Sequence, residues 1–160
     1  MNLQEIIIVF DETLEIGPDA ITEFQTNNEL RKDLLGYFKS NENRKFALGL
    51  LDKFSKLRRN ENGIASIEDL MLASYVLGQH NHVEDSSEIW KVKCIDFDTY
   101  CGVDVQLVVF AGVDKTKAYF ETAGYPEANS ALEYISECDE CGDFDNLDEY
   151  FSHNKLPWFL

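Results

Sequence analysis

The segment from Ile89 to Thr122 has the clearest alternation of hydrophobic and polar positions in the chain. It consists of the runs IWKVKCIDF, VDVQLVVFA and KAYFET, which are separated by DTYCG and GVDKT. Alternate positions of the central run are apolar: Val103, Val105, Leu107, Val109 and Ala111. A period of two is typical of a half-buried strand, and the two breaks contain Gly and Asp, which favour turns. The pattern therefore predicts a three-stranded antiparallel β-meander at about residues 89–122.

Helical spacing predicts helices on both sides of this meander. The run Ile6–Phe10 fits either state, because its neighbours recur at helical spacing while its β-branched residues favour a strand; we favour a helix. Later helices are expected to begin at capping or turn residues: Pro18 with Asp19, Asn41 or Asn43, and Ser66 with Asp69.

Two segments beyond the meander, residues 128–137 and 147–151, also have helical spacing. The final residues, 157–160, are too apolar to stay in solvent, so we expect them to pack on the core. The predicted fold class is α+β: a single domain, residues 1–160, with N-terminal helices, a central antiparallel meander and C-terminal helices.

Composition favours one globular domain. The chain has 160 residues, 44% of them hydrophobic, which is enough for a core despite a net charge of −16. The apolar run Ile6–Phe10 is short and flanked by acids, unlike a signal peptide, and no stretch approaches the roughly 20 apolar residues of a membrane span. Four cysteines without a secretion signal indicate reduced thiols in a cytoplasmic protein.

The charge is unevenly distributed along the chain. Residues 31–59 hold nine basic and three acidic side chains, whereas residues 118–154 hold ten acidic side chains and no Lys or Arg. Such an acidic segment repels phosphates and anionic lipids, so it disfavours nucleic acids and membranes and favours a basic protein partner. The candidate partner-binding residues are Glu137, Asp139, Glu140, Asp143, Asp145, Asp148 and Glu149, with Asp96, Asp98 and Asp104 around the first predicted turn.

The cysteines and histidines offer weak candidates for chemistry. Cys138 and Cys141 have the spacing of a zinc pair or a redox motif, but Cys94 and Cys101 are too far apart to complete a typical zinc site. Acids beside Cys138 and Cys141 raise thiol pKa values and weaken a thiolate nucleophile. The sequence His80-Asn81-His82 lacks the helical spacing of catalytic zinc ligands, so a solvated loop is favoured.

Other catalytic or metal-binding motifs do not fit. An EF-hand loop starting at Asp139 would place Phe144 and Tyr150 where glycine and glutamate are required. There is no glycine-rich phosphate loop and no serine nucleophile elbow. The sequence therefore predicts no enzymatic activity, no cofactor and no metal.

The segment from Ser66 to Tyr125 resembles a family of uncharacterised bacterial domains. The resemblance rests on Ser66-Ile-Glu-Asp-Leu70 at a helix start, on the His80–Asp85 loop, and on the predicted meander that ends in Glu121-Thr-Ala-Gly-Tyr125. Members of that family are thought to be immunity proteins of toxin systems. This sequence has Asp98-Thr-Tyr-Cys-Gly102 where they have a Trp-Asp-Glu-Glu-His-Gly type of turn.

The resemblance implies an immunity protein, which would neutralise a basic toxin domain, such as a nuclease, by direct binding. Two alternatives are an intracellular adaptor or regulatory protein and, less favoured, a metal- or thiol-dependent enzyme. The sequence leaves the oligomeric state open.

Overall fold

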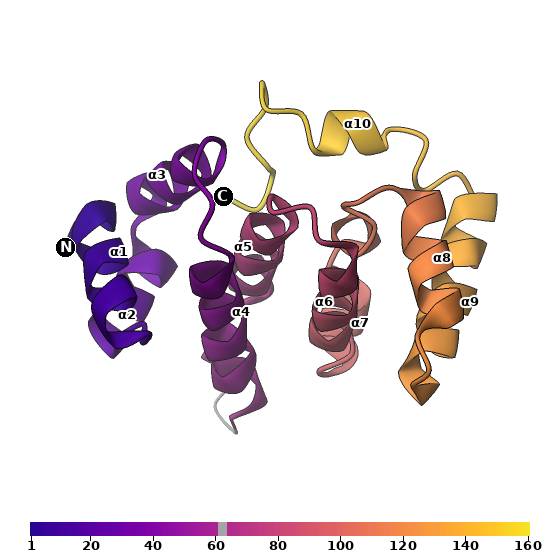
Figure 1. The fold of residues 1–160 in the computed structure, drawn as a ribbon, viewed down its shortest axis with the longest axis horizontal. Coiled ribbons are helices and arrows are strands. Elements are labelled where there is room, and N and C mark those ends of the chain that lie inside the picture. The colour runs from indigo at the N-terminus through magenta and orange to yellow at the C-terminus, as the bar shows by residue number, and fades with distance from the viewer. Residues whose placement is uncertain (61–63) are drawn as a thin grey trace. The chain divides into compact units, whose positions relative to one another are not determined.

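Helices form throughout the described part of the chain, residues 1–60 and 64–160 of a computed structural model (Figure 1). The chain divides into two compact units. Unit 1 comprises residues 1–80 together with 158–160, and unit 2 comprises residues 81–157.

Unit 1 is built from helices that begin at local capping signals. They are α1 (Leu3–Thr13), α2 (Pro18–Thr26), α3 (Asn28–Phe38), α4 (Arg44–Arg59) and α5 (Ile67–Gly78). The predicted starts at Pro18, at Asn43 and at the Ser66–Asp69 capping box are confirmed. The run Ile6–Phe10 is helical, as favoured from its spacing. Asn27 caps α3 by accepting from the Leu30 amide, which separates α2 from α3.

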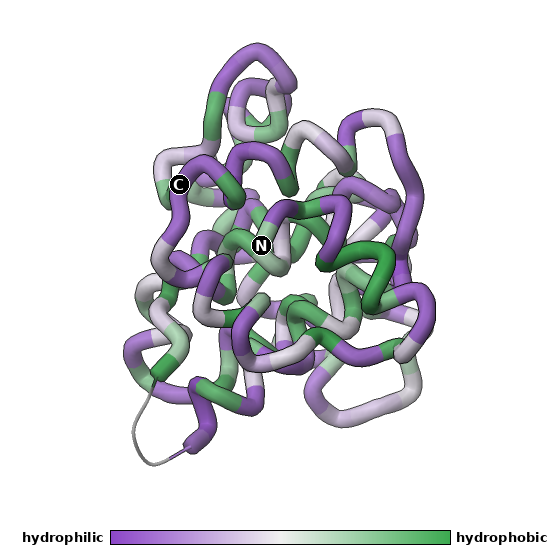
Figure 2. Tube along the Cα trace, turned by 90° about the vertical axis from the view of Figure 1, so that its left-hand side faces the viewer, coloured by the Kyte–Doolittle hydropathy of each residue, from purple (hydrophilic) through white to green (hydrophobic). Residues whose placement is uncertain are grey.

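Aromatic side chains fill the core of unit 1. Phe24, Phe46 and Phe54 are completely buried. The Phe46 ring meets the Phe10 ring edge to face, with 5.1 Å between centroids, and stacks on Phe38 at 6.1 Å. The Cα trace changes between hydrophobic and hydrophilic residues within single helices, as expected when each helix buries one face (Figure 2).

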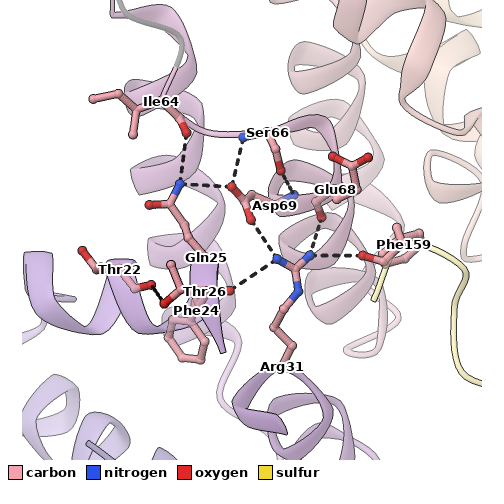
Figure 3. A network of polar contacts seen from close by, with 10 residues as sticks. All are labelled: Thr22, Phe24, Gln25, Thr26, Arg31, Ile64, Ser66, Glu68, Asp69 and Phe159. Carbon is pink, nitrogen blue, oxygen red and sulfur yellow. Dashed lines mark hydrogen bonds and ion pairs between the residues drawn. The ribbon is translucent and has the colours of Figure 1, made fainter. Parts of the chain in front are cut away.

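A buried ion pair crosses this core and fixes the end of the chain (Figure 3). Arg31 of α3 donates from Nη1 to Asp69 Oδ1 of α5 at 2.8 Å. Its Nη2 donates to the carbonyl oxygens of Glu68 and Phe159 at 3.1 and 3.2 Å. Phe159 is buried against Tyr75, whereas Trp158 is exposed, so the predicted packing of residues 157–160 is confirmed for Phe159.

Unit 2 is also helical. Its elements are the 3-10 turn η1 (Val83–Asp85), α6 (Ser86–Lys93), α7 (Phe97–Gly102), the 3-10 turn η2 (Val105–Leu107), α8 (Val113–Thr122), α9 (Pro126–Glu140) and α10 (Leu147–Tyr150). The predicted helices at 128–137 and 147–151 correspond to α9 and α10.

The predicted β-meander at residues 89–122 is wrong, and with it the α+β fold class. That segment forms α6, α7, η2 and α8, and the structure contains no strand in residues 1–60 or 64–160. In the central run Val108 is buried as well as Val105, Leu107 and Val109, so consecutive positions face protein and the apparent period of two does not mark one buried face. Its backbone is satisfied locally, since the Leu107 amide donates to the Asp104 carbonyl and the Val108 amide to that of Val105.

Candidate functional site

Helix α9 places the candidate acidic residues on the surface of unit 2. Its buried side chains, Ala128, Ala131, Ile135 and Cys138, recur at helical spacing and form one face. Glu137, Asp139 and Glu140 fall off that face in the last turns and are exposed. The carboxylates therefore project from the end of α9.

The turn after α9 adds more carboxylates to the same end. Gly142 adopts a φ of 84°, which ends the helix, and the Asp143 amide donates to the Cys138 carbonyl at 3.0 Å. Phe144 is buried and anchors the turn, whereas Asp143 and Asp145 on either side are exposed.

Helix α10 continues the surface with Asp148 and Glu149, both exposed. We call the set Glu137, Asp139, Glu140, Asp143, Asp145, Asp148 and Glu149 the acidic surface.

Two lysines neutralise part of the acidic surface. Lys117 of α8 pairs with Asp139, and Lys155 pairs with Glu149 at 3.1 Å. Within residues 1–60 and 64–160, no ion pair is seen for the remaining members, Glu137, Glu140, Asp143, Asp145 and Asp148. A local excess of negative charge remains.

The other candidate acids lie on short helices and not on strands. Asp96 is the N-cap of α7, where it accepts from the Thr99 amide at 2.8 Å, and Asp98 lies in the first turn of that helix. Asp104 precedes η2 and accepts from the Tyr150 hydroxyl of α10 at 2.8 Å. The structure thus brings Asp104 beside α10, although 46 positions separate it from Tyr150.

A lysine of unit 2 is buried, and the predicted meander places it in a strand. Lys93 is 2% exposed, and its ammonium donates to the carbonyl oxygens of Tyr100 at 2.6 Å and Val103 at 2.7 Å. These carbonyls lie at the C-terminal end of α7, so Lys93 caps that helix. Burial lowers the pKa of Lys93 below its ordinary value.

Two tyrosine rings lie beside this lysine, and a tryptophan ring packs against them. The Nζ atom lies 5.4 Å from the Tyr100 ring centroid and 5.3 Å from that of Tyr134. Tyr100 and Tyr134 are 5.4 Å apart, and Trp90 lies 5.6 Å from Tyr134. The Asp96–Thr99 capping box was the sequence signal that could have predicted α7 in place of a strand turn.

The structure shows the four cysteines as free thiols. Cys138 is buried, whereas Cys94, Cys101 and Cys141 are exposed, and all four are free. Burial, a hydrogen bond to Asp143 and the charge of that carboxylate raise the pKa of the Cys138 thiol to about 11. In the described chain, no group of three or more His, Cys, Asp or Glu side chains is arranged to hold a metal ion.

His80 is more ordered than the solvated loop that its neighbours suggested. Its Nε2 accepts from the Asn43 amide at 3.1 Å, and its Nδ1 faces the carbonyls of Val76 and Leu77. This places the proton on Nδ1. The ring also contacts Phe38, so the role of His80 is to hold helices of unit 1 together.

One hollow on unit 1 is lined mostly by apolar side chains. This hollow of about 300 Å³ is bordered by Ile16, Pro18, Ile21, Leu57 and Ile64 together with the polar residues Thr22, Gln25 and Lys53. Catalytic pockets require converging titratable groups, and Lys53 is the titratable residue among these lining residues.

Among the described helices, none is long and apolar enough to cross a membrane. Comparison of the chain with protein families, with curated proteins and with solved structures gives no match.

Proposed function

We propose that this protein is a binding module that captures a basic protein partner on the acidic surface of α9, the following turn and α10. The observation that carries the proposal is the exposure of all seven carboxylates together with the absence of an ion pair for Glu137, Glu140, Asp143, Asp145 and Asp148 in the described residues. Adjacent unpaired carboxylates repel one another, and a basic surface relieves that repulsion on binding.

The same charges favour rapid association. A protein with a net charge of −16 attracts a basic partner over distances comparable to the Debye length, about 10 Å at 0.1 M salt. Charges at the rim of an interface act mainly on the association rate. The acidic surface therefore steers the partner to unit 2.

The finer proposal is that the partner is a basic toxin domain, such as a nuclease, and that the protein acts as an immunity protein. Toxins that act on nucleic acid carry basic surfaces, which complement an acidic inhibitor. The resemblance through residues 66–125 motivates this proposal, while its β-meander is replaced by helices in the structure. The charge distribution supports an adaptor that binds another basic protein equally well.

A thiol-dependent enzyme is not favoured by the site. A catalytic thiolate requires a lowered thiol pKa. Partial desolvation instead raises the pKa of the Cys94 thiol, although its side chain reaches the surface, and the pKa of the Cys138 thiol is raised to about 11. Both shifts are opposite in direction to the one that a thiolate nucleophile needs.

The proposal is tested with a charge-reversal variant and a matched control. Glu140, Asp145 and Asp148 are replaced by Lys in the test variant, and Glu12, Glu15 and Asp33, exposed acids of unit 1, are replaced by Lys in the control. Both variants change the net charge equally. Because these side chains are exposed, both variants should keep the parent's circular dichroism spectrum. Their free energies of unfolding should stay within about 1 kcal/mol of the parent value.

Each protein then serves as bait for extracts of the native organism, and bound polypeptides are purified for stopped-flow measurement. The expected result is a basic polypeptide that binds the parent and the control, and whose association slows steeply between 0.05 and 1 M salt. A partner that binds the test variant as rapidly as the parent, with no dependence on salt, would refute the proposal.

A further inference from the structure

Helix α7 exposes two aromatic side chains at the surface of unit 2. Phe97 is 80% exposed, the largest exposed fraction among the large hydrophobic residues, and Tyr100 is 40% exposed. Side chains of this size are usually buried, and a pair of them one helical turn apart forms an apolar spot. We call Phe97 and Tyr100 the aromatic patch.

Buried hydrogen bonds hold the helix that carries the aromatic patch in place. Lys93 binds the carbonyls of Tyr100 and Val103, and the Thr99 hydroxyl donates to the carbonyls of Lys93 and Asp96. Thr99 is completely buried, and its side chain also accepts from the Asp96 amide in the capping box. A helix of six residues would not be stable alone, so these tertiary bonds fix α7 in place.

The Tyr100 ring is positioned in advance by its neighbours. Its ring centroid is 6.5 Å from that of Trp90 and 5.4 Å from that of Tyr134, both at steep interplanar angles. Because the ring is already immobilised, a ligand that packs on it loses little side-chain entropy on binding.

The aromatic patch adjoins the acidic surface. The Tyr100 ring packs against Tyr134 of α9, which precedes Glu137 by one helical turn. In agreement with this placement, the pKa of the Tyr100 hydroxyl is raised by burial and further by the negative charges of nearby groups, Glu137 among them. Tyr134, which touches the Tyr100 ring, is influenced in the same way by Asp143. Asp98 lies next to Phe97 in α7. Exposed aromatic side chains and carboxylates therefore occur together.

This combination matches the anatomy of a protein interface. Interface hot spots are enriched in aromatic residues at the centre, with charged residues at the rim. An arginine side chain fits both components, since its guanidinium stacks on aromatic rings and pairs with carboxylates. An acidic rim selects a basic segment and disfavours an acidic one.

We propose that Phe97 and Tyr100 are the anchor point for a basic polypeptide segment that contains arginine together with aromatic side chains. The arginines stack on Tyr100 and pair with Glu137, while an aromatic side chain of the segment covers Phe97. This inference rests on the proposed function, because it names the partner chemistry at one edge of the acidic surface.

The test uses two fluorescein-labelled octapeptides of equal charge, one alternating arginine with tryptophan and one alternating arginine with serine. Their affinities for the intact protein are measured by fluorescence anisotropy at 0.05 M salt. The tryptophan peptide is expected to bind about tenfold more tightly, the size of effect that one hot-spot residue provides.

The variant Phe97→Ser is expected to remove this preference to within about twofold while leaving the serine peptide's affinity unchanged. The control is Trp158→Ser, which removes an exposed aromatic side chain of unit 1 and should leave both affinities at the parent values. Circular dichroism verifies that Phe97→Ser is folded, as expected for a side chain that is 80% exposed.

The possible failures separate the two proposals. If both peptides bind the parent equally, or if Phe97→Ser leaves the preference for the tryptophan peptide intact, the aromatic anchor is refuted. The proposed binding by the acidic surface still stands in that case if reversal of Glu140, Asp145 and Asp148 weakens the binding of both peptides. If neither peptide binds the parent at low salt, both the anchor and the proposed function are refuted.

Discussion

Replacing Arg31 with methionine is expected to be among the most damaging substitutions in unit 1. Arg31 is 5% exposed, and its guanidinium donates to the Asp69 carboxylate and to the carbonyls of Phe24, Glu68 and Phe159 (Figure 3). Methionine has a similar unbranched stem but supplies no donor. The substitution therefore leaves a buried carboxylate without its cation.

The stability lost in Arg31→Met depends on the hydrogen bonds that Asp69 retains. Its Oδ2 still accepts from the Ser66 amide at 2.9 Å and from Gln25 Nε2 at 3.1 Å, so the carboxylate is not completely stripped of donors. Removing one partner of a buried ion pair costs about 3–5 kcal/mol, and the remaining hydrogen bonds place this site at the lower end of the range. A loss of about 3 kcal/mol is a large part of the 5–15 kcal/mol that typically stabilises a domain.

The assay is urea unfolding followed by tryptophan fluorescence in a Trp90→Phe background, in which Trp158 reports on unit 1. Lys32→Met is the matched control, because Lys32 follows Arg31 in α3 but pairs with Glu29 on the surface. The control should cost less than about 1 kcal/mol. Raising the salt concentration should reduce the loss of stability caused by Lys32→Met more than the loss caused by Arg31→Met, because buried charges are poorly screened.

A double-mutant cycle isolates the interaction between the two charges. Arg31→Met combined with Asp69→Leu should cost about 2 kcal/mol less than the sum of the two single variants, because the second substitution removes the orphaned carboxylate. If Arg31→Met cost less than about 1 kcal/mol, or if the two substitutions were additive, the ion pair would not be a major stabilising contact of unit 1.

Three further substitutions probe backbone conformation and buried thiols. Gly36→Ala should raise the free energy of unfolding by about 0.5–1 kcal/mol in urea titrations, because Gly36 is an exposed residue inside α3 and a Cβ there meets no atom within 4 Å. Leu14→Gly should raise the thermal midpoint, with a gain of about 0.5–1 kcal/mol, since Leu14 caps α1 at a φ of 58° with its side chain exposed; an unchanged or lower midpoint would contradict this reasoning. Cys138 has a folded-state pKa of about 11 against an ordinary value of 9.0, so the folded state is favoured by up to about 3 kcal/mol more below pH 9 than above pH 11. In urea titrations at several pH values, the free energy of unfolding should fall less between pH 9 and pH 11 in Cys138→Ala than in the parent. An equal dependence of that free energy on pH in both proteins would exclude this role for the thiol.

Local sequence signals predicted the helix starts of unit 1 well. The Ser66–Asp69 capping box and the Asn43 cap each join residues three positions apart, so their hydrogen bonds form within one helical turn. Asn27, the cap of α3, is absent from the helix starts that the sequence predicted. The Asn27 side chain makes the same kind of capping hydrogen bond, but the apolar pattern continues across the boundary between α2 and α3 and hides that boundary.

Of the ten candidate acids predicted from the sequence, the seven that form the acidic surface are exposed, whereas Asp96 and Asp104 are half-buried. Composition could not predict the aromatic patch or its support. The contacts that fix them are the bonds from Lys93 to Tyr100 and Val103 and the ring contact between Tyr100 and Tyr134, all between residues in different elements.

The sequence by itself determined the charge distribution, the helix caps and the apolar residues available for a core, because these depend on side-chain chemistry and on neighbours within a few positions. Only the tertiary structure decided that residues 89–122 are helical. A strand requires a partner for its backbone, whereas here Lys93 and short-range turns satisfy the carbonyls and amides of the segment. Packing on several sides buried consecutive valines, and this made alternation along the chain a misleading guide to secondary structure.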